Sequence, residues 1–284
     1  MYLVASGGTY GSNTSANGGI KLMTALGSCS KLPSSVTINE VTTVASAYAL
    51  SAFAIVNTSG GIEVGAPALA SDTSCNAQDN WQSSGPNTCN YTGLVHAFGT
   101  ANNLVGPATG VARSYTPAYT QNLATDTNIL NNSTVPTTGI NVLADMLASC
   151  VESDGSGCAR GLIKGATTGA ATSTTIPIVT SIDTLQAALN IAQNPGNNVS
   201  TLLGLVSSMA SQPYSTGTLL TQTTPPTDLT LALTYTGAGL GGAPNITFSD
   251  GNNGIYNSSL SIDALGNIWV AVYRTGGLFG SFNN

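Results

Sequence analysis

Apolar and polar residues alternate near the C-terminal end of this chain, on both sides of a short segment that contains Gly266 and Asn267. A period of two on each side of such a turn is the pattern of a β-hairpin. Two apolar residues keep the alternation before the turn and three keep it after the turn: Leu260, Ile262, Ile268, Val270 and Val272. The pattern therefore predicts two antiparallel strands between residues 259 and 273.

A short apolar run at the other end of the chain predicts one more strand. It consists of four consecutive residues, Tyr2, Leu3, Val4 and Ala5, and a glycine-rich stretch follows it up to residue 19. An isolated strand is not stable in water, so this strand must pair with another segment.

Between residues 20 and 211 the apolar residues recur every three or four positions, which predicts amphipathic helices. The expected helices cover about 22–26, 40–52, 92–105, 140–151, 182–192 and 199–209. Asn39 and Asn198 are expected to cap two of them, and either Ser181 or Asp183 is expected to begin the fifth. The helix after Asn39 carries its apolar residues on one face: Val41, Val44, Ala45, Tyr48, Ala49 and Ala52.

These patterns divide the chain into four segments and predict a mixed α+β fold. Residues 1–19 hold the N-terminal strand and the glycine-rich loop, and residues 20–211 form an Ala-rich helical domain. Residues 212–227 form a Ser/Thr/Pro linker, and residues 228–284 form an antiparallel β region. A strand is expected at the start of that region, where Leu229, Leu231, Leu233 and Tyr235 alternate.

The charge of the chain is low for its length. Only 6% of the 284 residues are charged, against about 25% in an average soluble protein. The net charge of -6 makes a nucleic acid an unfavourable partner. An uncharged surface of Ser, Thr, Asn, Gln and Gly is common in secreted and cell-surface proteins, so we expect an extracellular or cell-surface location. No apolar stretch has the length of a transmembrane helix.

Five cysteines support the same expectation. Cys75 and Cys89 flank a polar loop, and Cys150 and Cys158 flank a short turn. We therefore expect the disulfides Cys75–Cys89 and Cys150–Cys158, and Cys29 has no partner in this scheme. Closing a loop of about fifteen residues contributes roughly 3 kcal/mol in the chain-entropy model. Other pairings, and five reduced buried cysteines, remain open alternatives. The spacing of cysteines with the single histidine does not suit zinc, and no metal or cofactor is expected.

The C-terminal hairpin also resembles a known family. Residues 262–271, I-D-x-x-G-N-I-W-V-A, resemble the inner hairpin of an NHL-type β-propeller blade, and residues 38–53, 185–205 and 229–240 resemble segments of large secreted bacterial proteins, often acidobacterial, that carry such propellers. In those proteins an Ala-rich helical region precedes the propeller, and a strand similar to residues 2–8 ends a transthyretin-like sandwich. The resemblance implies architecture and export but no reaction. A propeller needs at least four blades, so we expect an incomplete blade here.

Motifs that carry chemistry are weak in this sequence. Gly237, Gly239 and Gly242 satisfy G-x-G-x-x-G, but a turn and strand are expected after them where a nucleotide-binding loop requires a helix. His96 is the only possible base of a serine-type triad, and its helical position predicts exposure. The segment that begins at Asp250 resembles only part of a calcium loop. Paired carboxylates for glycoside hydrolysis are not indicated. We therefore predict no catalytic residues.

Three functions remain, in this order. The first is a non-enzymatic extracellular structural protein. As a fibre subunit, it would pair strand 2–5 of one copy with the open hairpin of the next. The second is a spacer and ligand-binding module of a larger NHL-type propeller protein, and the third is a fragment of a propeller lyase or lactonase. Expected partners are further copies of the chain, neighbouring domains of a longer protein, or carbohydrate, on which Trp81 and Trp269 could stack.

Overall fold

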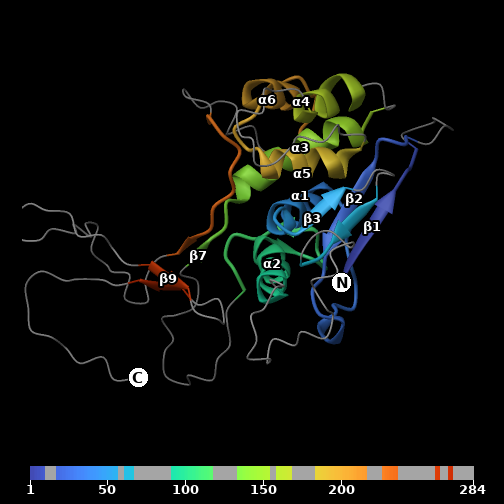
Figure 1. Cartoon of the computed structure of the whole chain (residues 1–284). Helices are drawn as coiled ribbons and strands as arrows, with labels where there is room; N and C mark the ends of the chain where they lie inside the picture. Colours follow the sequence, from blue (N-terminus) through green and yellow to red (C-terminus); the bar gives the residue numbers. More distant parts are fainter. Residues whose placement is uncertain are drawn as a thin grey trace, which may run out of the picture.

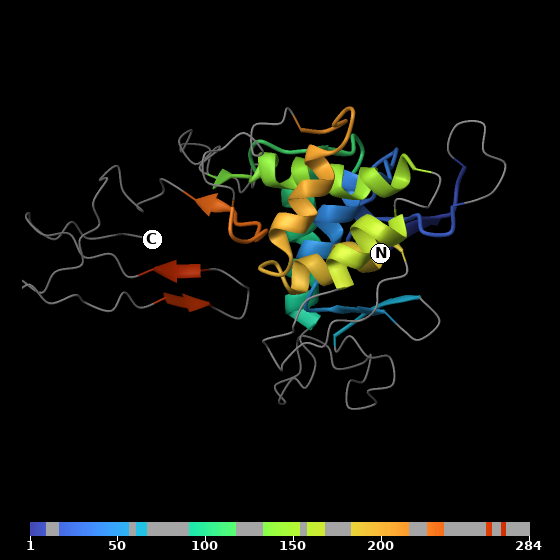
Figure 2. The same ribbon diagram turned by 90° about the horizontal axis from the view of Figure 1, so that it is seen from above.

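The computed structural model describes residues 1–9, 17–56, 61–66, 91–117, 133–153, 158–167, 183–215, 226–235, 260–262 and 268–270. Within these residues helices and short antiparallel strand pairs occur together, so the α+β class is confirmed. Figure 1 shows a body of helices with the N-terminal hairpin along one side, and Figure 2 shows the C-terminal hairpin lying apart from that body.

Six α-helices are described, with two short turns of other helical type. The α-helices are α1 (Glu40–Leu50), α2 (Tyr91–Leu104), α3 (Thr137–Val151), α4 (Lys164–Thr167), α5 (Thr184–Gln193) and α6 (Val199–Ser207). The 3-10 turn η1 covers Cys29–Lys31, and the π-helical segment η2 covers Cys158–Ile163. Helix α1 packs against α2, α3 and α5, and so lies at the centre of the body (Figure 1).

All described strands belong to two-stranded antiparallel pairs. The pairs are β1 (Tyr2–Ser6) with β2 (Lys21–Ala25), β3 (Ala54–Val56) with β4 (Ile62–Val64), β5 (Val105–Gly106) with β6 (Val111–Ala112), β7 (Ser133–Thr134) with β8 (Thr234–Tyr235), and β9 (Leu260–Ile262) with β10 (Ile268–Val270). Only the β1–β2 pair is five residues long. It is the main sheet element against the helices (Figure 1).

The helix expected at 22–26 is wrong, because this segment is strand β2. Leu22, Met23 and Leu26 are spaced as in one helical turn, but the segment is short and isolated helices of that length are marginal. Pairing with β1 gives it a backbone partner, and packing against α1 buries Met23 to 2% exposure. The partner that the N-terminal strand requires is therefore the segment Lys21–Ala25 of its own chain.

Helix α1 begins as expected but does not have one apolar face. Asn39 is its N-cap, with Oδ1 accepting from the Thr42 N–H at 2.9 Å, and Thr42 Oγ1 accepts from the Asn39 N–H at 3.0 Å. All residues from Glu40 to Ala47 are buried, whereas Ala52 is exposed beyond the end of the helix. Neighbours on several sides exclude water from polar and apolar positions alike.

The starts of α5 and α6 show two kinds of cap. Asp183 is the N-cap of α5, and its carboxylate accepts from the Gln186 N–H at 2.9 Å, which decides between the two expected starts. Asn198 occupies the N-cap of α6 with φ of 50° but forms no side-chain cap bond. Its amide donates instead to the Gly165 carbonyl at 3.0 Å, which ties α6 to α4.

The strand expected over 229–235 is shorter than the alternation suggested. Only Thr234–Tyr235 forms a strand, β8, which pairs with β7. Leu229 instead belongs to the helical core at 7% exposure, and its carbonyl accepts from the Tyr48 hydroxyl at 2.8 Å. Contact with the core, and not a sheet, holds the beginning of this segment.

We predict that Asn39→Ala lowers the free energy of unfolding by about 1 kcal/mol, since the first turn of α1 loses its cap. The variant also loses the bond from the Asn39 amide to the Gly110 carbonyl at 2.9 Å. Urea unfolding measures the effect. Ser200→Ala, in an exposed first-turn position of α6, is the control and should leave the midpoint unchanged. Equal midpoints for Asn39→Ala and the wild type would contradict the assignment.

Candidate functional site

The outer edge of β1 is an open edge of the N-terminal hairpin. Leu26 N–H donates to the Met1 carbonyl at 2.9 Å and Gly7 N–H to the Ile20 carbonyl at 2.9 Å, which fixes the direction of the intervening backbone groups. In an antiparallel pair these groups alternate between the two sides of a strand. The N–H and C=O groups of Tyr2, Val4 and Ser6 therefore point away from β2, and within the described residues no backbone bond closes this edge.

Apolar side chains accompany this edge. Met1 is 40% exposed, Leu3 is 39% exposed and Val4 is 41% exposed. Large apolar residues with this exposure on an edge strand are typical of a surface that pairs with another strand. Tyr2 is better anchored, because its hydroxyl donates to the Ile62 carbonyl at 3.3 Å and its ring packs against the core.

The inner edge of β2 is closed by side-chain hydroxyls of two helices. Lys21 N–H donates to Thr184 Oγ1 of α5, Met23 N–H to Thr43 Oγ1 of α1, and Ala25 N–H to Ser46 Oγ of α1. Each of these N···O distances is 2.9 Å. As far as the described residues extend, the side on which the hairpin can gain a further strand is therefore that of β1.

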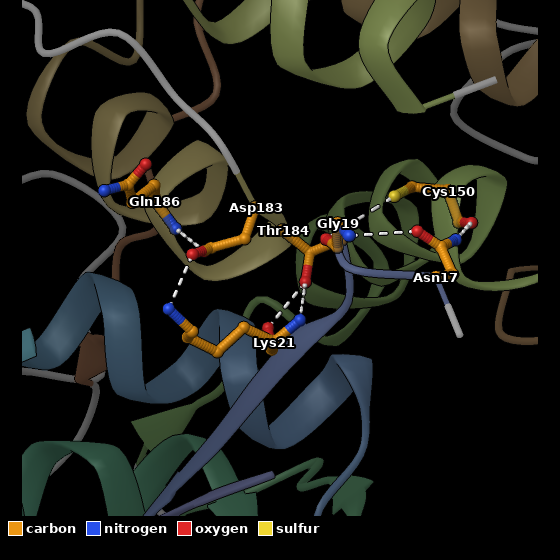
Figure 3. Close-up of polar contacts among 7 residues, drawn as sticks. All are labelled: Asn17, Gly19, Lys21, Cys150, Asp183, Thr184 and Gln186. Carbon is orange, nitrogen blue, oxygen red and sulfur yellow. Dashed lines mark hydrogen bonds and ion pairs between the residues drawn. The ribbon is translucent and has the colours of Figure 1, made fainter. Parts of the chain in front are cut away.

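Figure 3 shows how the first residue of β2 is held against α5. Lys21 Nζ lies 2.8 Å from Asp183 Oδ2, and the Thr184 hydroxyl donates to the Lys21 carbonyl at 2.5 Å while it accepts from the Lys21 N–H. The Asp183 side chain is 3% exposed and that of Lys21 is 22% exposed. A mostly buried pair with additional hydrogen bonds positions β2 more firmly than a surface ion pair does.

Sequence reasoning missed the residues that close the inner edge. Thr43 and Thr184 are fully buried and Ser46 is 1% exposed. Thr43 and Ser46 stand three positions apart in α1, which places them on one face of the helix. That spacing is the signal available in the sequence, but its meaning depends on residues 21–25 being a strand, where the sequence predicts a helix.

The predicted C-terminal hairpin has the expected pairing in β9 and β10. Ile262 lies opposite Ile268, Ser261 opposite Trp269 and Leu260 opposite Val270 in the register of the two strands. Val272 and the turn lie outside the described residues.

Among the expected disulfide cysteines, Cys150 and Cys158 lie at disulfide-bonding distance with 4.4 Å between their Cα atoms. Both are buried, at 0% and 2% exposure. Cys75 and Cys89 lie outside the described residues. Cys29 is an exposed free cysteine at the base of the hairpin.

The other candidate groups do not form a site in the described part of the chain. His96 is exposed on α2, as expected. Gly237, Gly239, Gly242, Asp250 and Trp81 lie outside the described residues. The described residues contain no group of acidic, histidine and cysteine side chains suited to a metal ion. None of the described helices combines the length and the apolar character needed to cross a membrane.

Two buried carboxylates bind the segment that follows α6. Asp145 is fully buried and accepts from the Tyr214 and Ser215 N–H groups, each at 2.9 Å. Glu40 accepts from the Tyr214 hydroxyl at 2.5 Å. Burial, and then this bond to Glu40, raise the pKa of Tyr214 above its ordinary value. These contacts attach the start of the expected linker to α1 and α3, and they use the carboxylates structurally.

A shallow, open depression of about 410 Å³ lies at the start of α3. Its lining residues are uncharged: Ser114, Tyr115, Thr134, Val135, Pro136, Thr137, Thr138 and Gly139. It contains none of the residues singled out in the sequence.

No family model, curated protein or solved structure matches the chain. The open edge of β1 is thus characterised by its own geometry, and the NHL-type resemblance stays a prediction.

We predict that Thr43→Val lowers the free energy of unfolding by about 1–3 kcal/mol, because the buried Met23 N–H loses its hydrogen-bond acceptor. Valine has nearly the same shape as threonine, so the packing of the site is otherwise kept. Thr43→Ser keeps the hydroxyl and is the matched control. Urea unfolding gives the stability, and amide hydrogen exchange at Met23 gives the local effect. A Thr43→Val protein with the exchange rate of the serine variant at Met23 would show that the hydroxyl does not close the edge.

Proposed function

We propose that this protein is a non-enzymatic extracellular structural protein whose copies assemble by addition of a β-strand to the open edge of β1. The outward backbone groups of Tyr2, Val4 and Ser6, with the exposed side chains of Leu3 and Val4, carry the proposal. Each backbone hydrogen bond formed there contributes about 0.5–1.5 kcal/mol, and burial of the apolar side chains adds to it.

The occupant that we propose is the β9–β10 hairpin of a second copy. Neither β1 (YLVAS) nor the two hairpin strands (LSI and IWV) contains a charged residue, so pairing desolvates no charge. The hairpin strands have outer edges that no described strand covers. The register pairs apolar residues at both ends of the hairpin strands, Ile262 with Ile268 and Leu260 with Val270.

A contact between opposite ends of two copies is head-to-tail. Such an interface uses different surfaces on the two partners, so each added copy presents a new open edge. If its rotation does not close a ring, the assembly grows as a fibre.

Extracellular location is part of the proposal. Its support is the buried Cys150–Cys158 pair and the low charge of the chain. Carbohydrate remains a candidate partner of such an uncharged surface.

We predict that Val4→Pro abolishes assembly but leaves the hairpin folded. The Val4 N–H points outward, so proline removes no bond to β2 and blocks the incoming strand. Light scattering and negative-stain microscopy of the full chain measure assembly, and amide exchange at Leu22 and Thr24 reports the hairpin.

Leu3→Pro is the matched control, because the Leu3 N–H points toward β2 and its loss should open the hairpin itself. Regular polymers of the Val4→Pro protein would refute addition at this edge. This pair of variants is sharper than deletion of residues 1–6, which would also remove the partner of β2.

We predict that a synthetic peptide of residues 259–273 shortens or prevents the polymers when it is added to the full chain before assembly. The peptide can occupy the edge of β1 but carries no β1 strand of its own, so it offers no edge of that kind to the hairpin of the next copy. A scrambled peptide of the same composition is the control. Polymer lengths that do not depend on the peptide would exclude the hairpin as the occupant.

The second candidate function is a spacer and ligand-binding module of a larger NHL-type protein. The pairing of β9 with β10 inside the resembling segment favours it. A chain that stays monomeric in both the wild type and the Val4→Pro variant would favour this function over assembly.

A further inference from the structure

The turn that leads into β2 lies directly against the Cys150–Cys158 disulfide. Asn17 is 7% exposed, and its amide nitrogen lies 3.4 Å from the Cys150 carbonyl, 3.4 Å from the Ser153 carbonyl and 3.8 Å from Cys158 Sγ. A Cβ atom on Gly19 would lie 3.3 Å from Cys158 Sγ, so a residue larger than glycine would be tightly packed against the disulfide.

Hydrogen bonds continue from this turn to the first residue of β2 (Figure 3). Gly19 N–H donates to Asn17 Oδ1 at 3.0 Å, and the Gly19 carbonyl accepts from the Thr184 N–H at 2.9 Å. Thr184 in turn bonds both backbone groups of Lys21 through its hydroxyl. A continuous set of contacts therefore joins the disulfide to the strand that holds β1 in place.

The two cysteines require a different arrangement when they are reduced. A disulfide holds its sulfur atoms about 2.05 Å apart, whereas two thiols must separate to van der Waals distance. The Asn17 amide contacts the Cys150 carbonyl and Cys158 Sγ at the same time, so separation of the sulfurs moves one of these partners and displaces either the turn at 17–19 or the start of η2. Both movements weaken the bonds of the Asn17 amide.

We propose that formation of the Cys150–Cys158 disulfide licenses assembly, because it sets the β1–β2 hairpin in the arrangement that accepts a strand. The inference rests on the function proposed above. It links the ability to assemble to arrival in an oxidising compartment, since disulfides form there and not in a reducing one. A chain that is still reduced keeps a loosened hairpin and does not polymerise early.

The oxidant is a disulfide of that compartment, which is itself reduced to a dithiol in the exchange. The Cys150 and Cys158 thiols lose two protons and two electrons, one S–S bond forms between them, and the oxidant's S–S bond is broken as it becomes a dithiol. This exchange takes place during folding, before the cysteines reach their buried positions. Burial to 0% and 2% exposure then keeps reductants away from the bond.

Linkage makes the effect reciprocal. If the disulfide favours the hairpin that binds a neighbour, then binding of a neighbour favours the disulfide by the same factor. Assembled protein should therefore resist reduction of Cys150–Cys158 more than unassembled Val4→Pro protein does.

The test compares the oxidised full chain with the Cys150→Ser/Cys158→Ser double variant. We expect amide exchange at Leu22 and Thr24 to be at least about tenfold faster in the double variant, with a smaller change in α2, and assembly by light scattering to be lost. Leu229→Ala, at a buried core residue whose backbone bonds Tyr48 and Pro195 and not the hairpin, controls for general destabilisation and should still assemble.

Asn17→Ala tests the link without touching the cysteines. The oxidised variant should show the same faster exchange at Leu22 and Thr24, because the turn loses its bonds to the Cys150 and Ser153 carbonyls. Unchanged exchange at these two amides in both Asn17→Ala and the double variant would overturn the coupling.

Failure of the two proposals is distinguishable. If the double variant assembles as the oxidised wild type does, the licensing role is wrong and strand addition stands. If the oxidised wild type itself does not assemble, strand addition is wrong and the licensing role falls with it.

Discussion

Three hydroxyl groups that accept from the inner edge of β2 determine how the hairpin and the helices fit together. A strand edge buried against helices would leave N–H groups without partners, at a cost of about 1–3 kcal/mol each. Helix backbones cannot accept these bonds because their carbonyls are used internally, so side chains must. Alternate residues of a strand lie about 6.8 Å apart and helix residues three apart rise about 4.5 Å. Thr43 and Ser46 bridge this difference with their side chains and thereby position α1 across β2.

The same contact makes the two edges of the hairpin different. Because α1 and α5 occupy the inner edge of β2, it is the β1 side that the described part of the chain leaves open to a further strand. A free edge is usually a liability that proteins shield with charges, prolines or a covering element. In β1 the edge carries Leu3 and Val4 instead, both exposed. The asymmetry between the two edges of this hairpin is the physical basis of the assembly that we propose.

The low charge of the chain extends to its interior. Lys21 and Asp183 form an ion pair, whereas many other buried polar contacts of the described residues are neutral hydrogen bonds of Thr, Ser, Asn and Tyr side chains. Such neutral bonds depend little on ionic strength and do not titrate near neutral pH. Asn17 is one of these groups, and it joins the disulfide to the hairpin although more than 130 residues separate it from Cys150.

The sequence by itself determined the local features of this protein. Asn39 and Asp183 identify helix starts, because a short acceptor side chain bonds the free N–H groups of the first turn within a few residues. The alternation around Gly266 predicts the pairing of β9 with β10, since both strands and their turn are contiguous. Only the tertiary structure decided that residues 21–25 form a strand, that Leu229 joins the helical core, and that Thr43, Ser46 and Thr184 close an edge. Each of these depends on a partner distant in sequence, and a five-residue apolar segment takes the conformation that gives its backbone a hydrogen-bonding partner.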